Sequence, residues 1–132
     1  MSGETNLDRL IASMQAVLHP ETFVFATIGT GPIPPGAQIV MQFQEAEGTT
    51  LILPMAQAEA LNLRHEYPCR MITLNIHSAL EAVGFLARIT NALAAEGMSV
   101  NPVSAFFHDH LFVPVAQAEL AMEVLGRISK ET

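Results

Sequence analysis

The chain has little basic charge and almost no cysteine or large polar aromatic residues: six lysines and arginines, one cysteine, one tyrosine and no tryptophan among 132 residues. With Cys69 as the single cysteine, neither an intrachain disulfide nor a cysteine-rich zinc site can form, and an inert buried thiol is expected. Thirteen acidic residues bring the net charge to −7, so the positive surface that phosphate backbones and anionic membranes require is missing. We therefore expect neither nucleic acid nor membrane as a partner.

Long apolar runs are also missing. The longest stretch without charge, residues 22–44, is broken by glycines and prolines between Gly29 and Gly36, which a lipid-exposed helix would not tolerate. The first ten residues carry Glu4 and Asp8 and lack the apolar segment of a secretory signal, so a cytoplasmic location is expected. Half of the residues are hydrophobic and only 14% are charged, which excludes a disordered chain.

Hydrophobic periodicity predicts an alternation of helices and strands. A Gly/Pro loop over 29–37 is too short for a crossover helix. The pattern is that of an α+β protein, with antiparallel sheets that carry their helices on one face. The predicted elements are a helix over 6–18, strands over 23–28, 38–45 and 49–53, a helix over 55–61, a strand over 70–77, a helix over 79–96, strands over 98–107 and 110–113, and a helix over 115–128.

An internal repeat at an offset of sixty residues organises the chain. The segment 51–59, LILPMAQAE, matches 111–119, LFVPVAQAE, at six of nine positions, and both copies read as strand, proline and helix. The repeat predicts two units, 1–66 and 67–132. The second follows the order β-α-β-β-α, a ferredoxin-like unit without its last strand, which either the other half or a partner chain would supply.

The segment that follows the strand over 70–77 holds the strongest candidate ligand site. Ser78 and Glu81 have the spacing of a helix capping box. Gly84 would cost about 1 kcal/mol relative to alanine within a helix, which indicates close approach of a ligand or of another chain. A helix start also offers unpaired amides to a carboxylate. Asn75 and His77 share a strand face and could line such a pocket, with Ser99 closing it.

The residues from Ile72 to Val100 resemble the first strand, loop, helix and start of the second strand of ACT domains, small ferredoxin-like modules that bind amino acids and regulate metabolic enzymes. With His108-Asp-His-Leu-Phe-Val-Pro114 added, the chain resembles a group of small, stand-alone bacterial tandem-ACT proteins of unassigned function. The resemblance implies two ferredoxin-like, ACT-type units and a regulatory protein that binds a small molecule, an amino acid above all.

Individual positions match the ACT pattern to different degrees. Glu81 and Gly84 match its acidic residue and glycine, whereas Val83 stands in the place of the usual proline and Ser99 in that of an asparagine. The resemblance implies ligand contacts in the loop ahead of the glycine and at the start of the second strand. The predicted ligand-binding residues are Asn75, His77, Ser78, Glu81, Val83, Gly84 and Ser99.

Two functions other than ligand binding are conceivable for such a chain. In the first, the ACT-like surfaces serve only as a protein-interaction or structural module; a homodimer is expected in either case, because the strand over 110–113 would leave an unprotected edge. The second is catalysis, which is not expected: the chain has no nucleophile elbow, phosphate loop or paired metal-ligand spacing, and no cofactor is implied.

A metal site at His108-Asp109-His110, with His77 as a third ligand, is likewise not expected. Histidines that flank a hairpin turn would point to opposite sides of the strand pair. Asp109 would instead bond to its own backbone, as is typical of turns.

Overall fold

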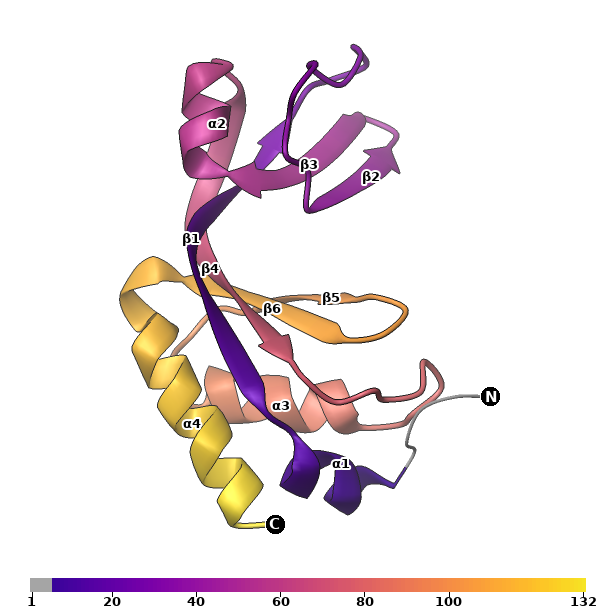
Figure 1. Ribbon diagram of the computed structural model, residues 1–132, viewed down its shortest axis with the longest axis vertical. Helices are drawn as coiled ribbons and strands as arrows, with labels where there is room; N and C mark the ends of the chain where they lie inside the picture. Colours follow the sequence, from indigo (N-terminus) through magenta and orange to yellow (C-terminus); the bar gives the residue numbers. More distant parts are fainter. Residues whose placement is uncertain (1–5) are drawn as a thin grey trace. The chain divides into compact units, whose positions relative to one another are not determined.

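The computed structural model describes residues 6–132 (Figure 1). Its contacts divide the chain into a central unit, Glu21–Cys69, and a terminal unit, which joins the described residues up to Pro20 to Arg70–Thr132. The elements are α1 (Leu7–Ser13), β1 (Ala16–Thr27), β2 (Met41–Glu45), β3 (Gly48–Pro54), α2 (Met55–Ala60), β4 (Arg64–Leu74), α3 (Phe85–Ala94), β5 (Asn101–Ser104), β6 (Asp109–Pro114), the short 3-10 helix η1 (Val115–Gln117) and α4 (Ala118–Lys130).

The central unit has the strand order β2-β3-β1-β4, the antiparallel arrangement of a ferredoxin-like fold. The predicted Gly/Pro loop takes the place of the first helix, so that α2 alone covers the sheet. Alternate residues of β1 and β3 form the apolar core beneath α2, because successive side chains of a strand point to opposite faces. This core consists of Val24, Ala26, Leu51, Leu53 and Ala58.

The terminal unit has the order β1-β4-β6-β5, so the start of β1 supplies the last strand that the β-α-β-β-α pattern lacks. Of the two sources left open by the sequence, the strand thus comes from the other half of the same chain. Figure 1 shows α1, α3 and α4 gathered on one side of β5 and β6. Their apolar faces form the larger core, which includes Leu10, Ile72, Leu74, Ile89, Leu93, Leu111 and Leu125.

The sixty-residue repeat is confirmed by strand register. Met41 pairs with Ile52 in the first hairpin, and Asn101 pairs with Phe112 in the second, each partner displaced by sixty. Pro54 and Pro114 end the two hairpins with nearly the same backbone angles, φ −56°, ψ 137° and φ −55°, ψ 141°. The fold class, two ferredoxin-like units with antiparallel strands, is confirmed as well.

Several predicted boundaries are wrong. The helix expected over 6–18 ends at Ser13, since the carbonyl of Gln15 accepts the amide of Asn75 at 2.6 Å and the chain then continues as β1. Strand β4 begins at Arg64 rather than at residue 70. The predicted division at 66/67 falls inside β4. It divides the chain by sequence repeat, whereas the two units described above divide it by contacts in space, so this division stays a prediction.

Among the described residues, no helix combines the length and apolar character that crossing a bilayer demands.

Candidate functional site

Helix α3 begins at Phe85, later than the predicted start near Ala79, because Gly84 ends the preceding loop in a left-handed conformation. Gly84 has φ +89°, which side chains other than that of glycine rarely adopt and which no helix can pass through. A Cβ added at Gly84 would meet only Leu7 at 3.6 Å, an ordinary contact. Backbone conformation, rather than the expected close approach, therefore explains this glycine.

The predicted capping box is wrong for the same reason. The hydroxyl of Ser78 does not cap a helix but donates to Asp109 Oδ2 at 3.1 Å. Glu81 lies exposed in the loop ahead of α3. The first helical bond of α3 runs from the Arg88 amide to the Gly84 carbonyl at 2.9 Å. The amides of residues 85–87 precede this bond and therefore have no partner within the helix.

Asp109 is 8% exposed and is the one buried charged side chain among the described residues. It lies in β6, opposite Ser104 of β5, on the same strand face as Leu111 and Val113. The turn role expected for it is wrong, since Asp109 belongs to the strand and its carboxylate accepts the Ser78 hydroxyl. A carboxylate is thus held at the margin of the apolar core.

A small cavity of about 130 Å³ joins these groups at the start of α3. It brings together a carboxylate, two serine hydroxyls and the first amides of a helix, the polar groups that a zwitterion would need. The lining comes from the loop ahead of α3 (Ser78, Ala79, Leu80, Ala82), from its start (Gly84, Phe85, Leu86, Ala87) and from the β5–β6 hairpin (Ser104, Ala105, Asp109).

Of the seven predicted ligand-binding residues, Ser78 and Gly84 line this cavity. The remaining five are not part of its lining, and ligand contact by them stays a prediction. Asn75 and Ser99 are exposed, as are Glu81 and Val83 in the loop, and the ring of His77 lies 5.8 Å from that of Phe107. The sequence reasoning missed Ser104 and Asp109 as lining residues; the alternation of Asp109 with Leu111 and Val113, which puts a carboxylate on the core face, could have revealed Asp109.

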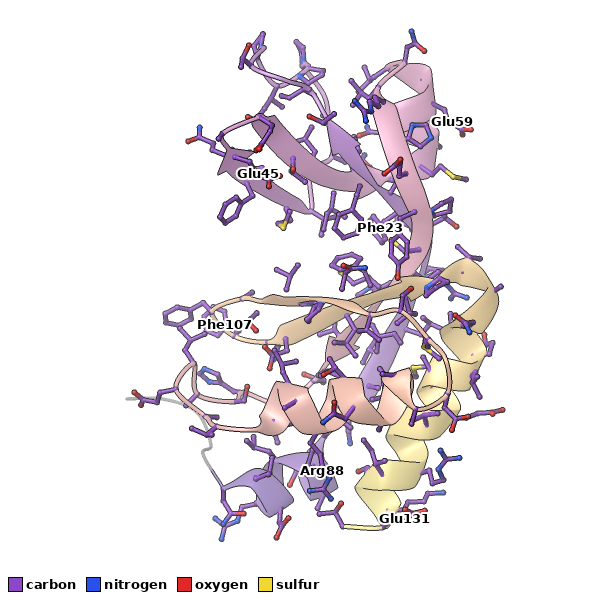
Figure 2. The ribbon with its side chains drawn as sticks, turned by 180° about the vertical axis from the view of Figure 1, so that it is seen from behind. Phe23, Glu45, Glu59, Arg88, Phe107 and Glu131 are labelled. Carbon is purple, nitrogen blue, oxygen red and sulfur yellow. The ribbon has the colours of Figure 1, made fainter. Side chains whose placement is uncertain are left out.

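An apolar rim borders the cavity. Phe106 and Phe107, in the turn between β5 and β6, are 65% and 62% exposed and lie with ring centroids 4.8 Å apart. Leu80 and Val83, in the loop ahead of α3, are 69% and 85% exposed. Figure 2 shows Phe107 projecting from the tip of its hairpin. Large side chains so exposed on neighbouring loops are typical of an interaction surface.

On the sheet face away from the helices, a polar row crosses β1, β4 and β6. Thr73 Oγ1 lies 2.8 Å from His19 Nε2 and 3.0 Å from His110 Nδ1. The rings of His108 and His110 are 6.4 Å apart. The expectation that these two histidines point to opposite sides is wrong. The turn lies earlier, at Phe106–Phe107, so His108 and His110 are alternate residues of one extended segment, and their side chains lie on the same face.

Burial lowers the pKa of His110, and the nearby His108 and His19 lower it further, while Asp109 acts in the opposite direction. Within residues 6–132, no group of three or more histidine, cysteine or acidic side chains has the geometry to hold a metal ion.

Burial raises the pKa of the Cys69 thiol to about 12, so this thiol stays protonated at neutral pH. It donates to the Phe23 carbonyl at 3.3 Å.

Family models of the ACT domain match residues 2–70 and residues 66–127. No curated protein matches the chain significantly. Among solved structures, the chain is similar to a Vibrio cholerae protein of unknown function, described as a possible transport protein, with 34% identity over 97% of this chain and 99% of that chain and a TM-score of 0.84.

Two more distant structures are similar in fold. An Agrobacterium tumefaciens protein is 16% identical over 88% of this chain and 89% of that chain, with a TM-score of 0.76. The ligand-free regulatory subunit of aspartate kinase from Thermus thermophilus is 12% identical over 89% and 97%, with a TM-score of 0.67. The two domain matches and the Vibrio relative lead to one conclusion: the chain belongs to the ACT-domain family and carries two ACT domains in tandem.

Proposed function

We propose that the terminal unit binds a small α-amino acid at the start of α3 and that the protein acts as a regulatory ligand sensor without a catalytic step of its own. The observation that carries this proposal is the cavity in which the Asp109 carboxylate and the first amides of α3 are brought together. An α-amino acid presents an ammonium group and a carboxylate on one carbon, so the two groups can be held at once.

Each polar group of the cavity has a role in this proposal. The amides of residues 85–87, at the positive end of the helix dipole, bind the ligand carboxylate. Asp109 accepts the ligand ammonium group, and the Ser78 hydroxyl, 3.1 Å away, holds the carboxylate of Asp109 in place. A volume of about 130 Å³ favours ligands with small side chains, such as glycine, alanine or serine.

The family supports a regulatory reading. ACT domains match both halves of the chain, and the similar Thermus thermophilus structure is named as a regulatory subunit. That likeness concerns the fold alone, so the ligand of this protein is argued from its own cavity.

A thermal-shift screen of the twenty amino acids tests the proposal. A ligand at a hundred times its dissociation constant stabilises the folded protein by about 2.7 kcal/mol, which is easily measured as a rise in Tm. The Asp109→Asn variant should lose that rise, because the amide no longer attracts an ammonium group, whereas Glu123→Gln, at an exposed position of helix α4, should keep it. If no amino acid raises the Tm, or if Asp109→Asn responds like the wild type, binding at this cavity is refuted.

A second function, a protein-interaction module, is favoured by the apolar rim of Leu80, Val83, Phe106 and Phe107. In that case the rim is buried against a second subunit and no amino acid changes the Tm. The two functions are compatible if the ligand is enclosed on assembly, and the oligomeric state measured with and without ligand separates them.

A further inference from the structure

The central unit contains a much larger cavity, of about 690 Å³, within the range of small-molecule sites. Val24 and Ala26 of β1 and Leu51 and Leu53 of β3 belong to the core beneath α2. The residues that lie between these core residues along the two strands therefore face the other side of the sheet, where this cavity lies. On this side of the sheet the lining includes Phe25, Thr27, Met41, Phe43, Glu45 and Thr50.

Strand register gives the cavity an apolar end. Phe43 pairs with Thr50, which also pairs with Thr27, and Met41 and Phe25 both pair with Ile52 one row further along. Phe43 lines a cavity large enough for a ligand, and its side chain is 64% exposed. A bound apolar group would cover this ring and remove its surface from water.

The other end has a backbone floor and an acidic rim. A Cβ at Gly48 would lie 2.7 Å from the Cα of Gly29, so the two backbones touch and no side chain can fill the space between them. Glu45 ends β2 and Glu47 lies in the adjacent β2–β3 turn, and Figure 2 shows Glu45 at this end of the sheet. The Thr50 hydroxyl donates to Glu45 and so keeps that carboxylate on the cavity side of the sheet.

Charge then selects the kind of ligand. Three carboxylates, those of Glu45, Glu47 and Glu66, line the cavity against a single guanidinium, that of Arg64. This balance attracts cations and repels anions. The aromatic faces of Phe25 and Phe43 add a weak attraction for an ammonium group.

We propose that the central unit binds an organic cation with an aromatic or apolar body, the body lying over Met41 and Phe43 and the ammonium group lying beside Glu45 and Glu47. This site is separate from the amino-acid site in the terminal unit and takes a different ligand. An α-amino acid would bring its carboxylate to the acidic rim, which disfavours it here.

Three probes of similar shape and different charge test the proposal. Phenethylamine carries a positive charge, 3-phenylpropionate a negative one and 2-phenylethanol none. Isothermal titration calorimetry of the full chain should show phenethylamine binding at least about tenfold more tightly than the other two. In amide NMR spectra, phenethylamine should shift the resonances of Gly29, Gly48 and Thr50.

Variants locate the binding within the cavity. Glu45→Gln combined with Glu47→Gln should weaken phenethylamine binding about tenfold or more, since it removes two charges while the new amide can still accept from Thr50. Phe43→Ala should weaken both phenethylamine and 2-phenylethanol. Glu59→Gln, exposed on α2, is the matched control and should bind as the wild type does, and so should Asp109→Asn.

The outcomes are decisive in either direction. Equal affinity for the three probes, or no binding of phenethylamine up to about 10 mM, overturns the proposal. Binding that survives the double glutamate substitution, or shifts confined to the terminal unit, places the cation elsewhere and also overturns it. Because the two sites lie in different units and Asp109→Asn should change only amino-acid binding, a failure here is distinguishable from a failure of the amino-acid site.

Discussion

At the scale of single residues, Gly84 and Gly126 show why the same amino acid has different roles in two helices. Gly84 caps α3 with φ +89°, whereas Gly126 lies within α4, where an added Cβ would have no atom within 4 Å. The sequence alone marks both as glycines in helical segments. The physical difference is the backbone angle, which periodicity does not report.

Alanine substitutions at these two glycines should therefore change stability in opposite directions. Gly84→Ala forces a Cβ into the left-handed region and should lower the free energy of unfolding by roughly 1–2 kcal/mol. Gly126→Ala restricts the unfolded chain and suits a helix, so it should raise that free energy by about 0.5–1 kcal/mol. Urea unfolding followed by circular dichroism measures both, and equal effects of the same sign would contradict the assigned role of Gly84.

Asp109 shows how far the candidate site could be predicted from the sequence. Ser78 and Gly84 were named from residue spacing and both line the cavity, although α3 begins at Phe85 and not near Ala79 as predicted. Asp109 was assigned to a turn, where an aspartate typically bonds to its own backbone. Its carboxylate became part of the site through β6 register and the Ser78 hydroxyl, which depend on pairing between segments distant in sequence.

At the scale of elements, the hairpins were predicted better than their surroundings. Pro54 and Pro114 end strands and precede helices in both copies, a local signal that any window of sequence contains. The start of β4 was missed because Pro68 and the charged residues around it are unusual in a strand, and Tyr67 has a positive φ of 65°. The extension of β1 was missed because its early residues continue the helical periodicity of α1.

The polar row across β1, β4 and β6 predicts a pH dependence of stability. His110 has a pKa below its ordinary value of 6.5 in the folded protein, first because of burial and then because of His108 and His19. The unfolded chain therefore binds a proton near pH 6.5 that the folded chain takes up only at lower pH. This contribution to stability is present above pH 6.5 and is lost as the pH falls through the folded-state pKa.

Urea unfolding at pH values above and below 6.5 tests this dependence. The wild type should lose more stability on acidification than His110→Asn, in which the amide can still meet the Thr73 hydroxyl but does not titrate. His65→Asn, in the central unit, controls for the general effect of removing a histidine. Parallel pH profiles of the wild type and His110→Asn would show that His110 does not couple protonation to folding.

At the scale of the whole molecule, the tandem architecture agrees with the sequence repeat, but one argument for a dimer fails. Strand β6 was expected to leave an open edge, yet it lies between β4 and β5. The dimer stays a prediction and rests instead on the exposed rim of Phe106, Phe107, Leu80 and Val83. The sequence of β6 does not tell whether the strand has a neighbour on each side, because strand order is a property of the assembled sheet.

Replacing Phe106 and Phe107 together by serine should convert the expected dimer into a monomer, because the two rings supply the largest apolar area of the rim. Size-exclusion chromatography with light scattering measures the change in mass. Phe43→Ser, an equally exposed phenylalanine of the central unit, is the matched control and should leave the mass unchanged. A dimer that survives the double substitution has its interface elsewhere.

Strands β1 and β4 each belong to both units, and this sharing has a consequence during synthesis. The central unit is continuous in the chain and has all its residues once Cys69 has left the ribosome. Helix α1 and the first residues of β1 emerge before it, yet their partners, the end of β4 and helices α3 and α4, are made afterwards. The segment translated before the central unit must therefore wait for the segment translated after it, with Leu10, Ile11 and Met14 uncovered in the meantime.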